Sequence, residues 1–342
     1  MSSPSAAAPT GPPLLVTGAT GFLGRALIAR LRAERPELPL RALVRSATSA
    51  GLPPGVEVVA GDLEDPASLA AAVSGAAAIV HAAAALASAD RRRLERVNVE
   101  GTGALAAAAR AAGVRRFLLV STSAVYGPSP SGEPRPESAP LAPQGPYAAS
   151  KAAAERAASE ALGGGAELVV VRPTGLYGPR RELYAQRLRA LGRLPFRVEL
   201  PGGERVQPCH VADAVTALLR CLAAPAAGER RFNLAGRSAL TIDELDARLA
   251  ALAGIRLRRA RLPVPLARAL VALRLALAPR EPEAARGLRE RARGVELAWR
   301  VDASLAERRL GLVWTPLDEG LREMVEIFLA ARGAGGRAGT KR

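Results

Sequence analysis

Short apolar runs alternate with alanine-rich stretches along the first half of the chain. Each run is four or five residues long, and each stretch between them has the length and composition of a helix. This alternation is typical of βαβ units in an α/β fold with a doubly wound parallel sheet that is buried on both faces. The predicted strands are Leu14 to Thr17, Leu40 to Val44, Val56 to Val59, Ala78 to His81, Phe117 to Ser121 and Leu168 to Val171.

The pattern changes beyond Arg172. The alternation fades, arginines become frequent, and a capping box from Thr241 to Glu244 opens one of several helical stretches. Before this point, residues 128 to 146 are rich in proline, which predicts a loop ahead of the next helix. We therefore expect a smaller, mostly helical C-terminal region beside the sheet.

The most specific motif follows the first predicted strand. The segment 17 to 24 has the sequence TGATGFLG and leads into a helical stretch. Its three glycines permit a tight turn, a close approach of the backbone to a pyrophosphate and close helix packing, while the helix N-terminus offers N–H donors. The turn predicts a dinucleotide-binding site made by Gly18, Thr20, Gly21, Phe22, Leu23 and Gly24.

Composition narrows the class of protein. With 342 residues, 49% hydrophobic and 23% charged, the chain can bury a substantial core and is not wholly disordered. Two cysteines, Cys209 and Cys221, cannot form a disulfide framework and fit a reducing cytoplasm. No spaced set of Cys and His predicts a metal site. Residues 66 to 89 lack charge but are too rich in alanine to insert into a bilayer.

The net charge of +16 comes from 46 Arg and 2 Lys against 32 acidic residues. Most arginines are interspersed with acids, and aromatic residues make up only 3%, which argues against nucleic-acid binding. Residues 251–300 differ, because 12 Arg and 4 Glu give this window a net charge of +8. The window also holds a helical stripe of leucines at 262, 266, 270, 273 and 277. We interpret this stripe as core, and weak association with an anionic membrane is the alternative.

Tyr147 and Lys151 lie four residues apart on a predicted helix and therefore on one face. A nearby ammonium lowers the pKa of a phenol from about 10, which prepares it for general acid/base catalysis. Lys151 is the only lysine outside the C-terminal tail, in a chain where arginine supplies nearly every other cation. Because arginine cannot replace a compact ammonium beside a phenolate, this lysine predicts a catalytic role.

Further motifs follow the glycine turn in a fixed order. They are Gly61 to Leu63, His81 to Ala84, Asn98 to Thr102, Ser121 to Gly127, Tyr147 to Lys151, Arg172 to Pro179, His210 to Asp213 and Leu310 to Trp314. With these motifs the sequence resembles the extended branch of the short-chain dehydrogenase/reductase superfamily, the NAD-dependent epimerase/dehydratase family.

The resemblance implies a Rossmann fold and roles for particular residues. Thr122 would orient the substrate oxygen, with Ser123 as the alternative, while Tyr147 handles the hydroxyl proton. Lys151 would tune Tyr147 and hold the cofactor ribose. The remaining cofactor-binding residues that it implies are Asp62, Leu63, His81, Ala82, Ala83 and Pro173.

The same resemblance suggests a division of the chain. Residues 13–178 would form the NAD(P)-binding Rossmann domain, rejoined by 207–235. The substrate-binding region would comprise 179–206 and 236–332. We expect a disordered leader at 1–12 and a flexible tail at 333–342.

The second predicted strand ends without a carboxylate, at Leu43-Val44-Arg45-Ser46. An acidic residue there would bind the ribose hydroxyls and select NAD, whereas arginine accommodates the 2′-phosphate of NADP. Arg45, with Arg25 just beyond the glycine turn, offers such a phosphate clamp. We therefore expect NADP(H), with NAD(H) as the alternative.

Two departures from the family bear on the substrate. Ser123 and Ala124 replace the Asp-Glu pair of the sugar-nucleotide 4,6-dehydratases, and Val206 replaces a pyrophosphate-binding arginine, with Arg205 one residue away. We predict an oxidoreductase that moves hydride between nicotinamide and a secondary alcohol or ketone, on a steroid-like or other apolar substrate.

Two other functions stay open. One is a nucleotide-sugar epimerase with tightly bound NAD, and the other is a non-catalytic dinucleotide-binding sensor or assembly subunit. For partners, we expect a small-molecule substrate, no nucleic acid and a homodimer.

Overall fold

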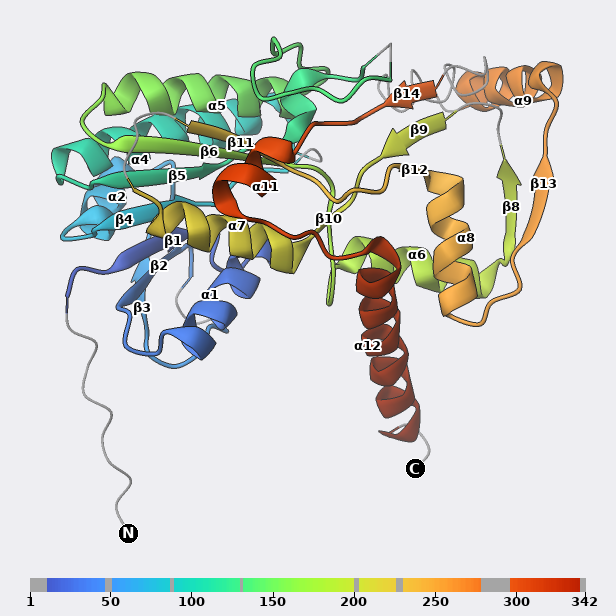
Figure 1. Cartoon of the computed structure of the whole chain (residues 1–342), viewed down its shortest axis with the longest axis horizontal. Coiled ribbons are helices and arrows are strands. Elements are labelled where there is room, and N and C mark those ends of the chain that lie inside the picture. The colour runs from blue at the N-terminus through green and yellow to red at the C-terminus, as the bar shows by residue number, and fades with distance from the viewer. Residues whose placement is uncertain are drawn as a thin grey trace.

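A computed structural model describes residues 11–46, 51–86, 89–129, 132–199, 203–225, 230–277 and 296–338. A seven-stranded sheet forms the larger part, with the order β11-β6-β5-β4-β1-β2-β3 and all neighbours parallel (Figure 1). Its strands are β1 (Leu14–Thr17), β2 (Leu40–Val44), β3 (Val56–Ala60), β4 (Ala78–His81), β5 (Arg116–Val120), β6 (Glu167–Pro173) and β11 (Arg230–Leu234). This confirms the predicted α/β fold class.

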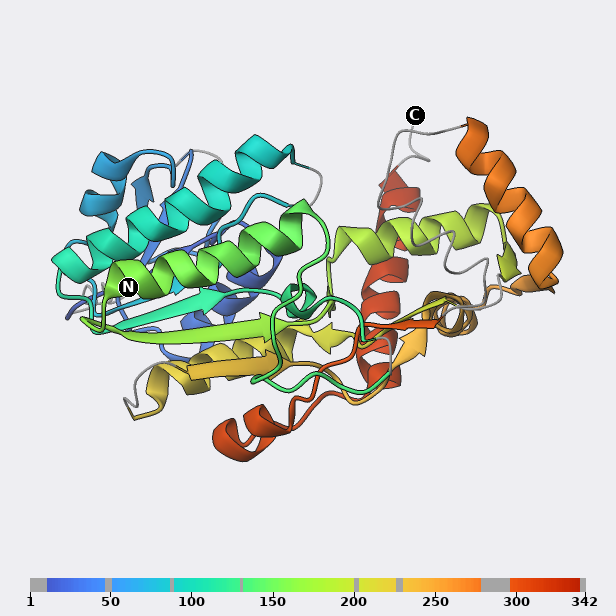
Figure 2. The same cartoon turned by 90° about the horizontal axis from the view of Figure 1, so that it is seen from above.

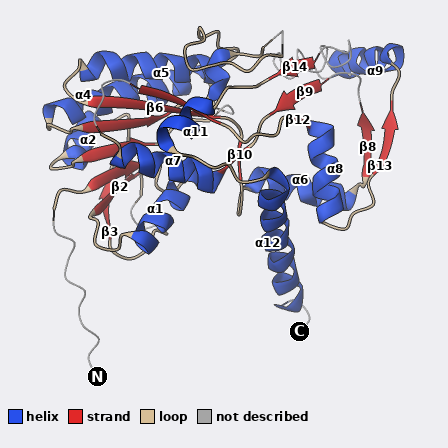
Figure 3. Cartoon of the chain, viewed as in Figure 1, coloured by secondary structure: helices blue, strands red, loops and turns tan. Residues whose placement is uncertain are grey.

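Helices cover both faces of the sheet, as the blue ribbons of Figure 3 show. Because alternate side chains of a strand point to opposite faces, Leu15 and Ile79 join one apolar layer and Val16 and Val80 the other. The helices on the first layer are α2 (Pro66–Val73), α4 (Gly101–Ala111) and α5 (Pro146–Leu162), and those on the second are α1 (Phe22–Glu34) and α7 (Val211–Ala223). Asp65 caps α2 ahead of Pro66.

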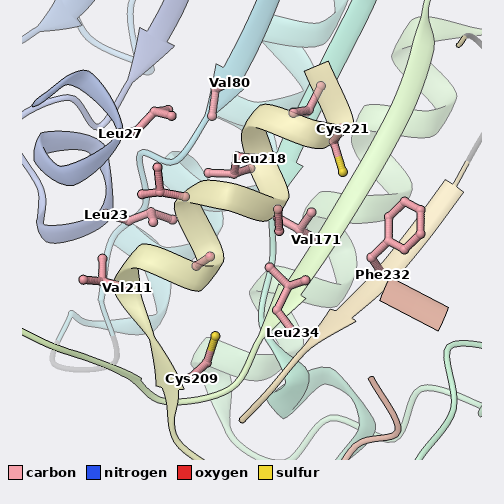
Figure 4. Close-up of a cluster of buried hydrophobic side chains, with 14 of the residues drawn as sticks. Leu23, Leu27, Val80, Val171, Cys209, Val211, Leu218, Cys221, Phe232 and Leu234 are labelled. Atoms are coloured by element: carbon pink, nitrogen blue, oxygen red, sulfur yellow. The ribbon is translucent and has the colours of Figure 1, made fainter. Parts of the chain in front are cut away.

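All six predicted strands are present, with ends that differ by at most two residues. The seventh strand, β11, comes from beyond Arg172 and pairs with β6. It follows α7, whose Leu218 packs in the same cluster as Val80 and Val171 (Figure 4). Residues 211–234 therefore extend the sheet that the first half of the chain begins.

The C-terminal region lies to one side of the sheet (Figure 2). Its apolar cluster includes Tyr177, Leu188, Leu249, Leu321 and Met324. Its main helices are α6 (Glu182–Arg193), α8 (Ile242–Leu252), α9 (Val264–Leu277) and α12 (Leu317–Ala338). Short strands that the sequence did not predict accompany them: β7 (Leu176–Tyr177), β8 (Phe196–Glu199), β9 (Gly203–Val206), β10 (Cys209–His210), β12 (Leu240–Thr241), β13 (Arg258–Arg261) and β14 (Glu296–Ala298). Two shorter helices lie outside this region, α3 (Arg91–Leu94) beside α5 and α11 (Ser304–Leu310) beside β11.

The interpretation of the leucine stripe as core is wrong for the central residues of α9. Leu266, Leu270 and Leu273 are 48%, 46% and 57% exposed. Helical periodicity places these leucines on one face, but no described element packs over that face closely enough to bury them. The side chain of Leu277 lies outside the described residues.

The two ends of the chain had been expected to lack structure. Residues 1–10 of the expected leader lie outside the described residues. At the other end, α12 continues to Ala338, into the segment 333–342 that was expected to be a flexible tail. A helix that has already formed gains a hydrogen bond with each added residue, which accounts for this extension. Among the described residues, no helix combines the length and apolar character needed to cross a membrane.

Candidate active site

The glycine turn joins β1 to α1 at the carboxyl edge of the sheet. Gly18 has a φ of 68°, and a Cβ atom there would lie 2.6 Å from the backbone of Ala82 and of Ala83. A Cβ atom on Gly24 would lie 2.2 Å from the Gly18 carbonyl oxygen. Any larger residue at either position would push apart the turn, the helix and the end of β4.

The start of α1 is suited to an anion. Gly21 is its N-cap and provides no side-chain cap, and the first turn holds no acidic residue. The first N–H groups of a helix lack partners within the helix, so those of Phe22, Leu23 and Gly24 can face a phosphate. The Leu23 side chain is 8% exposed and packs in the core, which leaves its backbone for such a contact. The turn thus fits the pyrophosphate of a dinucleotide.

His81 is fully buried at the end of β4. Its Nδ1 lies 2.6 Å from the Thr17 hydroxyl and its Nε2 lies 2.9 Å from the Thr102 hydroxyl. Burial, together with the charge of Lys151, lowers its pKa to about 3, so the ring is neutral. The Thr17 hydroxyl also accepts from the N–H of Ala83 at 3.3 Å. His81 therefore holds the Thr17 side chain in place. Through its bond with the Ala83 N–H, Thr17 in turn fixes the backbone that follows β4.

Further predicted cofactor residues follow other strands at the same edge. Arg45 is exposed directly after β2. After β3, the Asp62 carboxylate accepts from the Glu64 N–H at 3.1 Å, while Leu63 is 6% exposed and lies close to Gly101. Pro173 is the last residue of β6 and is buried. Because parallel strands end together, these residues share one edge with the glycine turn.

Thr20 and Arg25 link that turn to the segment after β2. The Arg25 guanidinium donates from Nε to the Thr20 carbonyl and from Nη1 to the Gly51 carbonyl, both at 2.9 Å. Arg25 thus holds the loop that follows Arg45 beside the turn. Arg25 and Arg45 are both exposed at this corner.

Lys151 is buried within α5, with 2% of its surface exposed. Its ammonium donates to the carbonyl of Val120, the last residue of β5, at 2.7 Å. Burial lowers the pKa of Lys151 to about 8, and the nearby Glu155 carboxylate partly opposes this shift. Since Thr122 follows two residues after Val120, the structure brings Lys151 to the strand end that carries Thr122.

Tyr147 lies one turn before Lys151 on α5 and is half-buried. Burial raises the pKa of its phenol, and the positive charge that opposes this shift is that of Arg181. We had expected Lys151 to lower this pKa, so the direction of the shift is opposite to the expectation. Desolvation of the phenolate outweighs attraction by a nearby cation here. At neutral pH the Tyr147 phenol is therefore protonated and able to donate.

The hydroxyl groups after β5 differ in their availability. Ser121 is 4% exposed and donates to the Glu155 carboxylate at 2.5 Å, so it is not open to a substrate. Thr122 is half-buried and caps the short 3₁₀ helix η3 (Ser123–Tyr126), where its Oγ1 accepts from the Ala124 N–H at 3.2 Å. Its O–H can still donate, because a hydroxyl both accepts and donates. Ser123 is also half-buried.

A buried polar network holds α5 against the sheet, and the sequence analysis did not find it. Arg172 on β6 makes a two-pronged ion pair with Glu155, at 2.9 and 2.5 Å. Arg172 also donates to the Tyr126 hydroxyl at 2.6 Å, which in turn donates to Asn233 on β11 at 2.9 Å. Arg172 lies in one of the family motifs, but nothing in the sequence paired it with Glu155.

Asn98 is a second contributor to which sequence reasoning gave no role. It lies in a π-helical turn, η2 (Glu95–Glu100), and is 1% exposed. Its amide donates to Ser150 at 2.9 Å, and Ser150 donates to the Tyr147 carbonyl at 2.8 Å. The family motif that contains Asn98 was the available signal, and π-helical turns are frequent at functional sites.

Arg181, just before α6, is the third contributor that was missed. Its guanidinium carbon lies 5.0 Å from the centre of the Phe22 ring in the glycine turn. Its charge also acts on the Tyr147 phenol. One arginine among 46 carries no distinguishing signal in the sequence.

At the position where many sugar-nucleotide epimerases carry a pyrophosphate-binding arginine, this chain holds Val206. Val206 packs against the C-terminal apolar cluster. Arg205 faces the other side of β9, as alternation along a strand requires, and lies 3.9 Å from the Glu244 carboxylate. The nearby His210-to-Asp213 motif serves packing, because Asp213 accepts from the N–H and hydroxyl of Thr315 ahead of α12.

Comparison with known proteins agrees with this geometry. The model of the NAD dependent epimerase/dehydratase family matches residues 14–235. The chain is 34% identical over 257 residues to a ceramide reductase of Caulobacter vibrioides, covering 73% of each protein. It is 36% identical to the 4-hydroxy-2-methyl-3-oxo-4-farnesyl-3,4-dihydroquinoline-1-oxide ketoreductase of Stigmatella aurantiaca, covering 66% of this chain and 71% of that protein.

A solved structure extends the likeness over nearly the whole chain. It is a dTDP-glucose 4,6-dehydratase double mutant from Streptomyces venezuelae with NAD bound. The TM-score is 0.73 at 28% identity, covering 94% of this chain and 98% of that one.

Proposed function

Because the chain belongs to the NAD-dependent epimerase/dehydratase family and is an NAD(P)-dependent oxidoreductase, we propose that it reduces a ketone of an apolar substrate to a secondary alcohol. The observation that carries this proposal is the buried Lys151, which donates to the Val120 carbonyl. That contact joins the helix that bears Tyr147 to the strand end that bears Thr122. Both lie at the edge of the sheet where the glycine turn offers a dinucleotide site.

The roles of the side chains follow from their states. The protonated Tyr147 phenol donates a proton to the carbonyl oxygen as negative charge develops on it, which favours reduction. The Thr122 hydroxyl orients that oxygen, while Lys151 keeps α5 in place and would hold the ribose of the cofactor. A bound nicotinamide cofactor supplies the hydride. The glycine turn would hold its pyrophosphate, and Asp62 and Leu63 would flank its adenine.

An apolar substrate is supported by two kinds of observation. Ser123 and Ala124 provide no acid and base for loss of water, and Arg205 is directed to Glu244 rather than to a sugar nucleotide. The ceramide reductase and the farnesyl-dihydroquinoline-oxide ketoreductase, both similar to this chain, have names that imply lipid-like substrates.

The test is a turnover screen of the purified protein with NADPH or NADH. Long-chain ketones, sterol ketones and UDP-sugars are offered separately, and nicotinamide absorbance and product identity are followed. We expect NADPH oxidation with an apolar ketone and a secondary alcohol as the product. Conversion of a UDP-sugar to its epimer without net cofactor turnover would contradict the proposal and favour the epimerase. Tight cofactor binding with no turnover at all would favour the non-catalytic binding protein.

We propose NADP(H) as the cofactor because Arg45 follows β2, where a carboxylate would select NAD. Loss of one charge-assisted contact to phosphate costs about 1.5 to 3 kcal/mol. Titration of NADPH and NADH into wild type and Arg45→Ala tests this. We expect Arg45→Ala to weaken NADPH binding roughly 10- to 100-fold and to leave NADH binding nearly unchanged. Equal NADPH affinity in the two proteins would remove this assignment.

The domain division of the chain is part of the same proposal. Residues 13–178 with 207–235 would bind NAD(P), and 179–206 with 236–332 would bind the substrate. The pairing of β11 with β6 supports the first group, and the separate apolar cluster of the C-terminal region supports the second.

We also propose that the protein is a cytoplasmic homodimer. Size-exclusion chromatography with light scattering tests whether it is a dimer. The two buried free cysteines suit a reducing compartment. The exposed leucines of α9 within the arginine-rich 251–300 window support weak association with anionic membranes.

A further inference from the structure

A groove lies between α6 and α12, next to the candidate active site. It has a volume of about 290 Å³, and its walls are apolar, formed chiefly by Leu188 on α6 and by Met324, Ile327 and Phe328 on α12. Figure 2 shows α6, in yellow-green, leading away from the sheet, and α12, in red, crossing α6 at a steep angle. The groove has arginines in its lining, and Arg180 and Arg181 lie where α6 begins.

Arg181 connects this groove to the reacting groups. It lines the groove, and its guanidinium carbon lies 5.0 Å from the Phe22 ring centre at the first residue of α1. Its charge also opposes the rise that burial causes in the pKa of Tyr147. Arg181 thus joins the groove to the first residue of the helix that follows the glycine turn.

The charge at this end of the groove is not neutralised. No carboxylate lies within 4.0 Å of Arg180 or Arg181 in the part of the chain that the structure describes, whereas Arg189 pairs with Glu182. The buried Nε of Arg181 has no hydrogen-bond partner among the described residues. Arg180 has a φ of 63°, a strained conformation of the kind that clusters at binding and active sites. A guanidinium without a carboxylate partner beside an apolar groove is suited to bind an anion.

We propose that the groove binds the alkyl part of an amphiphilic substrate, while Arg181 binds a carboxylate or phosphate close to its reacting ketone. This inference rests on the proposed ketone reduction and names the substrate class of that site. The order along the substrate is the ketone at Tyr147, the anionic group at Arg181 and the alkyl chain against Leu188 and Phe328. Charge complementarity selects an anion over a neutral lipid, and the apolar walls select an alkyl chain over a sugar.

Binding measurements test this without requiring turnover. Decyl phosphate, decanoate and decanol are titrated by calorimetry into protein saturated with NADP⁺, below the concentrations at which they aggregate. We expect decyl phosphate or decanoate to bind at least tenfold more tightly than decanol. Whichever anion binds more tightly identifies the anionic group.

Two variants and a control locate the contacts. Arg181→Gln should abolish the preference for the anions and leave decanol binding unchanged. Ile327→Trp, at a position that is 39% exposed and can accept a larger ring, should weaken all three ligands at least fivefold. Arg248→Gln removes an arginine that pairs with Asp318 away from the groove, and it should behave as wild type.

Several outcomes would overturn the inference. Equal affinity for decanol and the anions, or a preference that persists in Arg181→Gln, removes the role of Arg181. Unchanged binding in Ile327→Trp removes the groove. If Arg181→Gln weakens NADP⁺ instead of the amphiphiles, the arginine serves the cofactor and the inference fails. Anion-selective binding in a protein that reduces no ketone would retain the groove and refute the proposed function alone.

Discussion

Helices α5 and α9 differ in composition, and their burial is the reverse of what their compositions suggest. α5 is rich in alanine and has few large apolar residues, yet it buries Lys151 and Glu155 against the sheet. α9 carries a stripe of leucines, yet Leu266, Leu270 and Leu273 are about half exposed. Burial in this protein thus does not follow the hydrophobicity of the helix itself.

The partners around each helix explain the contrast. The Val120 carbonyl accepts from Lys151, while Arg172 and Ser121 satisfy Glu155. A buried charge is tolerable when it is paired and hydrogen-bonded in this way. The exposed leucines of α9 have no described element over them. Alanine lets α5 approach the strands closely enough for these polar contacts to form.

The largest expected effect concerns the reacting face of α5. Tyr147→Phe removes the proton donor and should reduce turnover roughly 10²- to 10⁴-fold while the protein stays folded. Lys151→Arg should reduce turnover at least ~10-fold and move the pH optimum, because a planar guanidinium does not fit the buried site of a compact ammonium. Steady-state rates across pH, with thermal melting, measure both. Lys341→Arg in the C-terminal tail is the matched control, and wild-type rates in Lys151→Arg would exclude Lys151 from the mechanism.

Among these variants, the largest effect on the free energy of unfolding should come from the buried ion pair between Glu155 on α5 and Arg172 on β6. Glu155→Gln leaves Arg172 without its countercharge and should lower the free energy of unfolding by about 3 to 5 kcal/mol. Glu160→Gln removes the other glutamate ion pair of α5, which is exposed and 3.7 Å long, and should change it by less than ~0.5 kcal/mol. Denaturant titration of both variants measures the difference. Equal effects would mean that burial of the pair adds nothing to stability.

Lys151 should also make stability depend on pH. Its pKa falls from 10.5 to about 8 on folding, so between these values the unfolded chain holds the proton more tightly. The lysine therefore destabilises the fold below about pH 8, and this cost is relieved as pH rises towards 10.5. Lys151→Met removes the cost, so its stability advantage over wild type should shrink by at most about 1.4 kcal/mol per pH unit. Denaturant titrations at pH 7 to 10 measure it, and parallel profiles would contradict the lowered pKa.

The smallest expected effect lies on α9. Leu270→Ala should change the free energy of unfolding by less than ~0.5 kcal/mol, whereas Leu249→Ala on α8, which is 0% exposed, should cost about 2 to 5 kcal/mol. A large cost at Leu270 would show that its face is covered in solution.

Co-sedimentation with anionic but not neutral vesicles at low salt, reduced in Leu270→Ala, would support the membrane proposal. Equal sedimentation with both kinds of vesicle would contradict it.

Much of the sheet and the cofactor edge could be predicted because their signals are local. A buried parallel strand needs a short apolar run, and the glycine turn needs small residues at 18, 21 and 24. The spacing of Tyr147 and Lys151 puts them on one helical face whatever the surrounding fold. The pKa of Tyr147 could not be predicted in this way, since it depends on desolvation by residues distant in sequence.

The amino-acid sequence by itself determined six strands of the large sheet, the glycine turn and the helix that carries Tyr147 and Lys151, because each depends on residues within one element. Only the tertiary structure decided that Glu155 meets Arg172, that Arg181 reaches Phe22 and that the leucines of α9 remain exposed. These outcomes depend on which surfaces meet across the fold. Forty-six arginines look alike in the sequence, and their neighbours in space give each a different charge environment.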